Sequence, residues 1–272
     1  MTQIAFIGGG NMARSLISGL LARGHRADQI TVAEPIAAAR TALFADFAVR
    51  VEARNDLAIA TADVIVLAVK PQVMASVCHD LKPALGPRRP LIISIAAGIT
   101  LGHLQRWLGA SAALLRAMPN TPALIGEGIS GLYAGDQVDD AQKALAISLL
   151  AAAGETCWIE NEALMDVVTA VSGSGPAYFF LLMEAMIYAA IAQGLPAASA
   201  RQLVLQTALG AARMAKESDD PPAVLRQRVT SPNGTTQAAI EILTGEHLPD
   251  TIAKAILRAT ERGRELSAEI GP

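Results

Sequence analysis

A cluster of polar residues in the second half of the chain could bind a small ligand. Its members, all within the segment TSPNGTT, are Thr230, Ser231, Asn233, Thr235 and Thr236. An apolar run with helical spacing follows directly, and a helix start uses one or two such residues as caps. The cluster therefore has two interpretations. It is either an elaborate turn and cap, or a site that directs many hydrogen-bond donors at a small polar ligand.

A glycine-rich turn near the N-terminus has the spacing of a dinucleotide site. The apolar run IAFIG, residues 4–8, predicts a buried strand, and leucines at helical spacing follow it. Between them, Gly8, Gly10 and Ala13 form the fingerprint G-x-G-x-x-A. The first glycine permits a tight turn, the second lets the backbone approach a pyrophosphate, and the alanine allows close packing of helix on strand. The pattern predicts a nicotinamide dinucleotide with its phosphates at the helix N-terminus.

Three more strands are predicted downstream, and they end near Glu34, near Lys70-Pro71 and near Gly98. The repeated alternation of strand and helix predicts an α/β N-terminal domain with a Rossmann-like, doubly wound parallel sheet. The strand ends lie along one edge, where such folds bind ligands. Glu34 stands about where an acidic residue meets the adenosine ribose.

The second half of the chain is predicted to be helical. From about Glu162 onward the strand signal disappears, and several of the helices are apolar on most of their circumference. That surface is more than a small monomer can easily bury, so an intertwined dimer is expected. The sequence predicts a dinucleotide-binding domain over residues 1–160 and an all-α substrate-binding and dimerisation domain over residues 161–272.

Two further segments could contribute to a site. In VSGSGPAY, the run Ser172–Gly175 precedes Pro176 at an expected first helical position, where backbone N–H groups would favour an anion. The alternative is tight glycine packing between helices. In RAMPNTPAL, two prolines flank Asn120 and Thr121, and this segment could simply be a rigid connector.

Composition excludes several classes of partner. The net charge is -3, with acidic and basic residues interspersed, so no nucleic acid is expected. No signal peptide is recognised, and the most apolar stretch, residues 177–192, is interrupted by Glu184 and shorter than the ~20 residues of a membrane span. Cys78 and Cys157 have no metal-like spacing, so no metal site is expected. A cytoplasmic location is the default.

The residue inventory favours reduction of a C=N bond over oxidation of an alcohol. An alcohol dehydrogenase needs a base, usually His or Lys, to take the hydroxyl proton. All four histidines lie outside these motifs, and the helix after VSGSGP carries no Lys, His or Asn. A protonated imine already accepts hydride, so the protein must mainly hold the substrate and hydrogen-bond its nitrogen. Hydroxyl groups and backbone amides can do that.

The chain resembles the pyrroline-5-carboxylate reductases along essentially its whole length. The residues that carry the resemblance are FIGGGNMA, LAVKPQ, SIAAGIT, MPNTP, VTAVSGSGPAYFF and TSPNGTT. The resemblance implies hydride transfer from NADPH or NADH to 1-pyrroline-5-carboxylate, which gives L-proline in the last step of proline biosynthesis. It also implies a homodimer with interlocked helical domains, often assembled further.

The resemblance assigns roles to individual positions. Ser231 and the backbone around Gly234 and Thr235 would hold the substrate carboxylate, while Thr236 would donate a hydrogen bond to the ring nitrogen as hydride reaches the adjacent carbon. Glu162 falls where the family places a carboxylate near the substrate, and its alternative is an exposed acid at a helix start. The cofactor residues would be Gly8, Gly9, Gly10, Asn11, Met12, Glu34, Asn55, Ala68, Val69, Lys70, Pro71, Ala97 and Gly98.

Two departures from the family pattern limit what can be transferred. Many relatives have a small polar residue in place of Glu34, which leaves the choice between NADPH and NADH open. Relatives can also have alanine in place of Thr235, so its backbone is the useful part. The competing interpretations are a 3-hydroxyacid dehydrogenase, a reductase of another cyclic imine or one that uses a deazaflavin, and a non-catalytic dinucleotide-binding regulator.

Overall fold

The computed structural model describes residues 2–271 and divides into two compact units. The first unit comprises residues 2–174 and 257–271, and the helical unit is Gly175–Ile256. This division differs from the predicted boundary at residue 160. Residues just beyond the boundary join the first unit because their side chains bond within it, as Glu162 does with Arg116.

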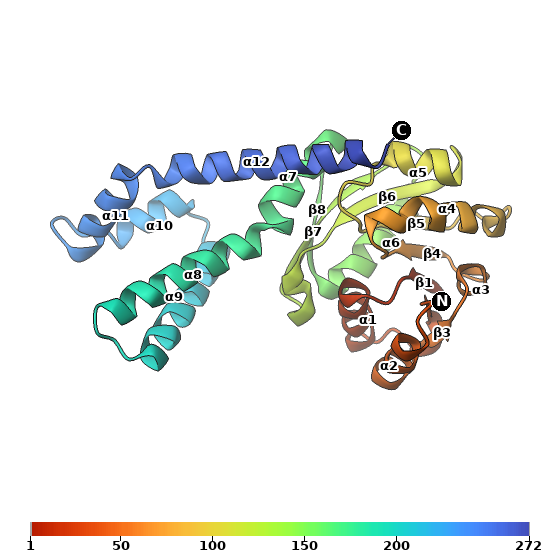
Figure 1. Ribbon diagram of the computed structural model, residues 1–272, viewed down its shortest axis with the longest axis horizontal. Coiled ribbons are helices and arrows are strands. Elements are labelled where there is room, and N and C mark those ends of the chain that lie inside the picture. The colour runs from red at the N-terminus through yellow and green to blue at the C-terminus, as the bar shows by residue number, and fades with distance from the viewer. Residues whose placement is uncertain (1, 272) are drawn as a thin grey trace. The chain divides into compact units, whose positions relative to one another are not determined.

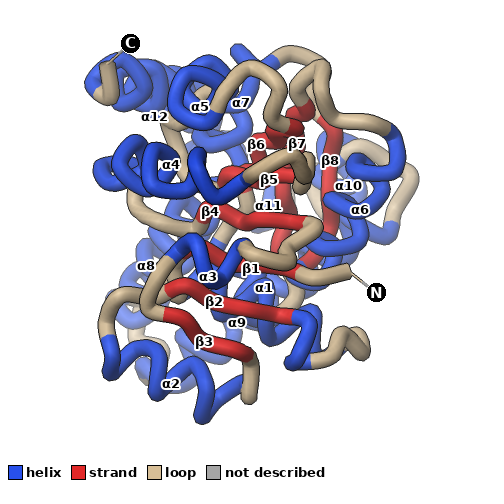
Figure 2. Tube along the Cα trace, turned by 90° about the vertical axis from the view of Figure 1, so that its right-hand side faces the viewer, coloured by secondary structure: helices blue, strands red, loops and turns tan. Residues whose placement is uncertain are grey.

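An eight-stranded sheet with the order β3-β2-β1-β4-β5-β6-β7-β8 forms the centre of the first unit, and Figure 2 shows its strands in red. The strands are β1 (Ile4–Ile7), β2 (Ile30–Ala33), β3 (Arg50–Glu52), β4 (Val64–Leu67), β5 (Leu91–Ser94), β6 (Ala113–Met118), β7 (Gly128–Ala134) and β8 (Gly154–Trp158). The four predicted strands are confirmed as β1, β2, β4 and β5.

The helices of the first unit alternate with these strands along the chain (Figure 1). The α-helices are α1 (Asn11–Ala22), α2 (Ala37–Phe47), α3 (Asn55–Ile59), α4 (Pro71–Leu85), α5 (Leu101–Leu108), α6 (Asp140–Leu150) and α7 (Met165–Val168). The short helices are η1 (Ala27–Gln29), η2 (Thr121–Ile125), η3 (Ala151–Ala153), η4 (Glu162–Leu164) and the π-helix η5 (Thr169–Gly173).

Two hydrophobic clusters cover the two faces of the sheet. In β1, Ile4 and Phe6 belong to one cluster, whereas Ala5 and Ile7 belong to the other, as the alternation of side chains along a strand requires. The first cluster takes its helical residues from α1, α2 and α6, and the second takes them from α3, α4 and α5. Burial on both faces explains why the central strands β1 and β4 are continuously apolar.

The sheet departs from an all-parallel arrangement at one pair of strands. β7 runs antiparallel to β6, with Leu115 opposite Ala134, while every other pair is parallel. A parallel neighbour needs a long crossover connection. Only the segment from Pro119 to Glu127, with the short helix η2, joins these two strands, so the chain turns back. The predicted Rossmann-like fold is confirmed as a mostly parallel sheet.

Replacing Gly19 by alanine is expected to destabilise the first unit. Gly19 lies within α1, where a Cβ would overlap the carbonyl oxygen of Ala152 in η3. Overpacking of this kind costs about 1–3 kcal/mol of the free energy of unfolding, which lowers the melting temperature by about 3–10 °C. Gly102→Ala in α5 is the control, because its Cβ would meet only ordinary contacts beyond 3.4 Å. Calorimetry that gives both variants the same melting temperature would contradict this account of Gly19.

The rest of the chain is helical, as predicted. Its elements are α8 (Gly175–Ala192), α9 (Ala197–Glu217), α10 (Pro222–Arg228), α11 (Thr235–Gly245) and α12 (Leu248–Glu269). Helices α8 and α9 pack side by side, joined by a short turn at Gly194 (Figure 1). The second part of α12, from Leu257, belongs to the first unit.

Candidate functional site

The predicted cofactor residues of the first unit follow the carboxyl ends of its parallel strands. β1 leads into Gly8, whose amide donates to Ala33 O (2.9 Å), and Ala68 at the end of β4 donates to Ile7 O (2.8 Å). Gly8 has φ +97°, and a Cβ there would lie 2.8 Å from Ala68 O. Only glycine allows both the left-handed backbone and this approach of the two loops.

Helix α1 begins directly behind this turn and presents free donors. Its N-cap is Gly10, without a side-chain cap bond, and among residues 2–271, apart from Gly10 and its two chain neighbours, no atom lies within 4 Å of the place where a Cβ would stand. The N–H groups of the first helical turn have no partner within the helix. Open space above unpartnered amides at a helix N-terminus is the environment that binds a phosphate.

The carboxylate of Glu34 lies against the same turn. Its Oε2 accepts from the Gly9 amide (3.1 Å) and its Oε1 from the Ile36 amide (3.1 Å). Arg40, the nearest downstream cation in sequence, donates to the backbone oxygens of Glu34 (2.7 Å) and Pro35 (2.8 Å). The acid therefore faces the glycine-rich loop while the guanidinium holds the backbone beneath it.

The remaining predicted cofactor residues lie at starts of helices or in the loop after β5. Asn55 is the first residue of α3, and Lys70 is the N-cap of α4, in which Pro71 is the first residue. Ala97 and Gly98 lie between β5 and α5, where Gly98 has φ +74° beside the backbone of Leu266 and Ser267 in α12. The fold thus brings the predicted set to one edge of the sheet.

Glu162 has partners that the sequence did not indicate. Its Oε1 accepts from Arg116 Nη1 (2.8 Å) and from the Leu101 amide (2.7 Å). The side chain is 27% exposed and that of Arg116 only 7%. Glu162 does begin the short helix η4, as the alternative expected, but it is only partly exposed, because its carboxylate is the counter-ion of a buried guanidinium. A lone arginine in the apolar run ALLRAM was the available signal for Arg116.

Two titratable groups lie near this ion pair. Burial raises the pKa of the Asp166 carboxyl, with Arg116 and Arg264 acting in the opposite direction. Burial also lowers the pKa of His103, whose Nδ1 accepts from the Thr100 amide (3.1 Å). The histidine thus stays neutral to lower pH than an exposed one, and its ring stacks on Trp107 at 5.5 Å.

In the helical unit, the segment TSPNGTT forms a turn and the first two residues of α11. Gly234 is the N-cap of α11, and no side chain makes a cap bond there. Asn233 has φ +58°, and its backbone N–H donates to Gln237 Oε1 (2.7 Å). Within residues 2–271, the hydroxyl groups of Ser231, Thr235 and Thr236 have no hydrogen-bond partner. The helix start therefore does not use these three hydroxyls for capping.

Helix α8 begins at Gly175, one residue before the predicted first position at Pro176, but the polar run before it is not a loop. Residues Thr169–Gly173 already form the π-helix η5, so the polar run is part of a helix that continues from α7. Ser172 Oγ donates to Val168 O (2.9 Å), which returns its hydroxyl to the helix. A Cβ on Gly173 would lie 2.7 Å from Cε of Met118, at the flexible end of a side chain of β6, whereas Gly175 has open space, so tight glycine packing between helices stays a prediction.

The segment MPNTP acts as a connector in the first unit. Asn120 is 8% exposed; its Oδ1 accepts from the Ile129 amide (2.9 Å), and its Nδ2 donates to Ser172 O (3.1 Å). One amide side chain therefore ties β7 to η5, in agreement with the interpretation of a rigid connector.

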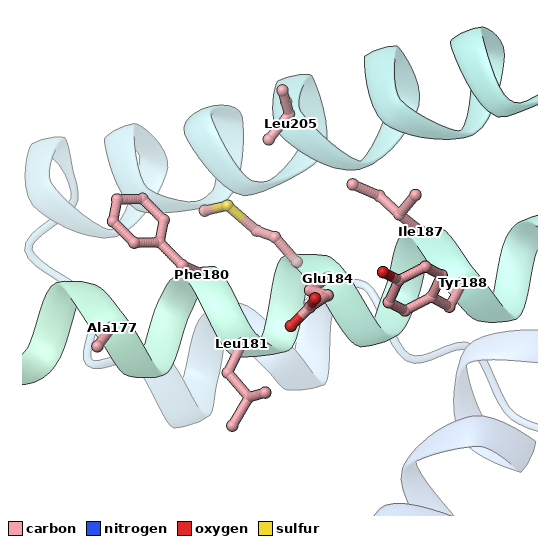
Figure 3. A pocket seen from close by; sticks show the side chains of 8 residues that line it. Ala177, Phe180, Leu181, Glu184, Ile187, Tyr188 and Leu205 are labelled. Atoms are coloured by element: carbon pink, nitrogen blue, oxygen red, sulfur yellow. The ribbon is translucent and has the colours of Figure 1, made fainter.

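An apolar groove follows α8 where it faces α9, with a volume of about 620 Å³ (Figure 3). Around it, Phe180 is 63% exposed, Leu181 65% and Tyr188 65%. Glu184 is the acidic side chain within this lining. So many exposed apolar side chains on one helix are typical of a surface that another chain covers.

The same helix is long and apolar enough to cross a membrane, by length and composition alone. Within the described residues it is the one helix with these properties; it covers Glu162–Ala192, and its apolar part is 6% buried. The expectation that the stretch is too short for a span is wrong for the length, because η5 joins α7 to α8 in one helix of 31 residues. The apolar groove of Figure 3 lies on this helix.

A mostly parallel sheet with a glycine-rich turn after its first strand defines the first unit as a dinucleotide-binding oxidoreductase domain of the Rossmann type. Two family models agree with this architecture. One, described as NADP oxidoreductase, coenzyme F420-dependent, matches residues 3–98, and one described as pyrroline-5-carboxylate reductase dimerisation matches residues 162–266.

Individual relatives extend the similarity to the full length. A pyrroline-5-carboxylate reductase of Pseudomonas aeruginosa is 52% identical over 99% of this chain and 98% of its own. The structure of a pyrroline-5-carboxylate reductase from Coxiella burnetii has a TM-score of 0.94 at 42% identity, with 98% of both chains covered. The pyrroline carboxylate reductase of Plasmodium falciparum, solved with NADP bound, has a TM-score of 0.87 at 29% identity and the same coverage. The chain belongs to the pyrroline-5-carboxylate reductase family, which confirms the resemblance, and its helical half carries the family's dimerisation region.

Proposed function

We propose that this chain transfers hydride from NADPH or NADH to the C=N bond of 1-pyrroline-5-carboxylate and so forms L-proline. The observation that carries the proposal is the start of α11, where Ser231, Thr235 and Thr236 hold hydroxyls without partners in residues 2–271. In a member of this family, such a cluster suits a small substrate with a carboxylate and a ring nitrogen. If the segment were only a helix cap, these three hydroxyl groups would be expected to make capping hydrogen bonds, which they do not.

The cofactor site is proposed along the carboxyl edge of the sheet. The free amides at the start of α1 and the open space above Gly10 suit a pyrophosphate, and Asn55 with Ala68–Pro71 would line the adenosine and ribose side. Ala97 and Gly98 would approach the nicotinamide half. The reduced nicotinamide supplies a hydride when it is bound. The P. falciparum relative, solved with NADP, supports this class of cofactor.

The substrate contacts are proposed in the helical unit. Ser231 and the amides around Gly234 and Thr235 would bind the carboxylate at the N-terminus of α11, where the helix dipole favours an anion. Thr236 would donate a hydrogen bond to the electron pair that develops on the ring nitrogen as hydride arrives. As the imine carbon gains the hydride, its π bond to nitrogen breaks, and the electron pair stays on the nitrogen, which already carries its proton. Glu162 as a substrate contact stays a prediction.

An assay tests this function directly. Purified protein is mixed with 1-pyrroline-5-carboxylate and either NADPH or NADH, and the absorbance of the reduced nicotinamide is followed. We expect oxidation that depends on both reactants and forms proline. A reaction with a reduced deazaflavin is a control, because one matched model is described as F420-dependent. No turnover with either nicotinamide would reject the proposal, and turnover of a 3-hydroxyacid would favour that alternative.

Glu34→Ser is expected to improve kcat/KM for NADPH relative to NADH. The carboxylate can accept hydrogen bonds from ribose hydroxyls, but it repels a 2′-phosphate by about 1 kcal/mol in water and about 4 kcal/mol at an effective dielectric of 20. The ratio should therefore change by at least about fivefold. Glu127→Ser, an equal change of charge at an exposed loop position, should leave the ratio unaltered. An unaltered ratio in Glu34→Ser would mean that this carboxylate does not face the ribose.

The proposed assembly is a homodimer with interlocked helical domains, which can assemble further. Two observations support a dimer: the exposed apolar residues of α8, and the match of residues 162–266 to the family's dimerisation region. The proposed domains are residues 1–160 for the dinucleotide and residues 161–272 for substrate and dimer. A cytoplasmic location is proposed, without nucleic-acid or membrane partners.

A further inference from the structure

The first unit buries an arginine beneath the loop that is proposed to approach the nicotinamide. Arg116 lies in β6, opposite Ser94 of β5, and its side chain is 7% exposed. Within the part of the chain that the structure describes, Glu162 is the acid that pairs with it, at 2.8 Å. A buried guanidinium is costly unless it is paired and hydrogen-bonded, so this pair holds η4 firmly against β6.

The same carboxylate oxygen reaches the start of α5. Glu162 Oε1 accepts from the amide of Leu101, the first residue of α5, at 2.7 Å. That amide has no acceptor inside the helix, and a negative charge at the N-terminus of a helix interacts favourably with the helix dipole. The loop of residues 95–100, with Ala97 and Gly98, ends at this helix start.

The other side-chain bonds of this loop are local. The Ala96 amide donates to Ser94 Oγ (3.4 Å), and Thr100 and His103 form a capping box within four residues. Within residues 2–271, Glu162 is the one side chain from outside β5 and α5 that hydrogen-bonds the backbone between Ile95 and Leu101. The hydrogen bond from the Leu101 amide to Glu162 therefore holds the end of the loop, where α5 begins, in place.

We propose that Arg116 and Glu162 form a positioning pair that holds the loop of residues 95–100, and through it the nicotinamide ring, in place for hydride transfer. This inference depends on the proposed function. It gives Glu162 a role that Oε1 performs within the protein by accepting from two donors, and the kinetic test below distinguishes this role from a substrate contact through Oε2. A displacement of about 1 Å can cost about 100-fold in rate, so such a pair can matter without touching a reactant.

The first test needs no cofactor. Glu162→Gln keeps the shape and an acceptor oxygen but removes the charge that holds Arg116. Amide hydrogen exchange of the peptide covering residues 95–104 should become about tenfold faster, while that of residues 4–22 stays unchanged. Glu160→Gln, an equal change at an exposed neighbour, is the control and should leave both peptides as they are.

The second test separates positioning from substrate binding. In Glu162→Gln, kcat should fall about tenfold or more, with KM for the imine substrate within about twofold. The kinetic isotope effect with nicotinamide deuterated at the transferred position should rise, since hydride transfer becomes slower. Arg116→Met combined with Glu162→Gln should lose less than the sum of the two single changes, because neither charge is then left unpaired.

Two results would overturn the inference. One is unchanged exchange in residues 95–104 together with a KM for the imine raised about tenfold, which would make Glu162 a substrate contact. The other is unchanged exchange with unchanged kcat. If Glu162→Gln does not fold, Glu162→Asp, which keeps the charge but shortens the side chain, is judged by the same criteria. Absence of turnover in the unaltered protein would reject the proposed function, while hydrogen exchange would still decide whether the pair holds the loop.

Discussion

Thr236→Val is expected to lower kcat/KM for 1-pyrroline-5-carboxylate by roughly 10- to 150-fold. Valine keeps the shape of threonine and removes the hydroxyl, which has no partner in residues 2–271. A hydrogen bond to a charged group contributes about 1.5–3 kcal/mol, and this energy corresponds to that range of rates if the bond serves the transition state. The assay is steady-state kinetics at saturating cofactor.

Stability and cofactor binding should remain near those of the unaltered protein. A capping hydroxyl is worth roughly 0.5–2 kcal/mol of stability, but Gly234 caps α11 without any side-chain bond. The melting temperature and the dissociation constant of the dinucleotide are therefore the controls for Thr236→Val. A variant that lost stability and kept its turnover would show that the hydroxyl belongs to the fold.

Thr235→Ala is the matched variant at the next position. Its hydroxyl is also free within the described residues, but the proposed contact is the backbone amide, which alanine keeps. We expect kcat/KM within about twofold of the unaltered protein, since no transition-state bond is removed. A loss as large as that of Thr236→Val would mean that both hydroxyls contact the substrate.

Leu181→Asp is expected to dissociate the homodimer. Leu181 is 65% exposed in the single chain and lines the groove of α8 (Figure 3). Burying a leucine is worth about 1.5–3 kcal/mol, and a two-fold interface contains each residue twice. The dissociation constant should rise by about 100-fold or more, because a buried carboxylate adds its own cost.

Light scattering at low micromolar concentration measures this change. The unaltered protein should have at least the mass of a dimer, and Leu181→Asp should approach the mass of one chain. Leu57→Asp in α3, 52% exposed in the first unit, is the control and should keep the mass. A well-folded, active monomer of the unaltered protein would contradict the assignment of α8 to the interface.

Local signals in the sequence were sufficient for most of the architecture. The positive φ that Gly8 adopts, the apolar runs of β1, β2, β4 and β5, and the helical spacing after Glu162 all depend on residues close together in the chain. The turn at Gly8 and the free start of α1 followed from the fingerprint alone, because spacing and residue type decide them.

Short-range patterns were misleading where neighbouring elements decide the conformation. The run VSGSGP has the composition of a helix start, and α8 does begin within it at Gly175, but its first three residues already belong to the π-helix η5, in which Ser172 bonds back to Val168. Likewise, β7 turns antiparallel to β6 since the connection between them holds only a short helix.

The sequence by itself determined the family, the dinucleotide turn and the polar cluster at Thr236, whose residues are neighbours in the chain. The hydrogen-bond and ion-pair partners of the protein's charged side chains were decided only by the tertiary structure. Glu34 meets Gly9 across 25 residues of chain, and Glu162 meets Arg116 across 46. Contacts of this kind produce no repeating pattern in the sequence, because the fold decides which donor or acceptor comes close to a charged side chain. The burial of Arg116 in β6 makes a partner necessary, but the position of η4 beside the start of α5 is what makes that partner Glu162.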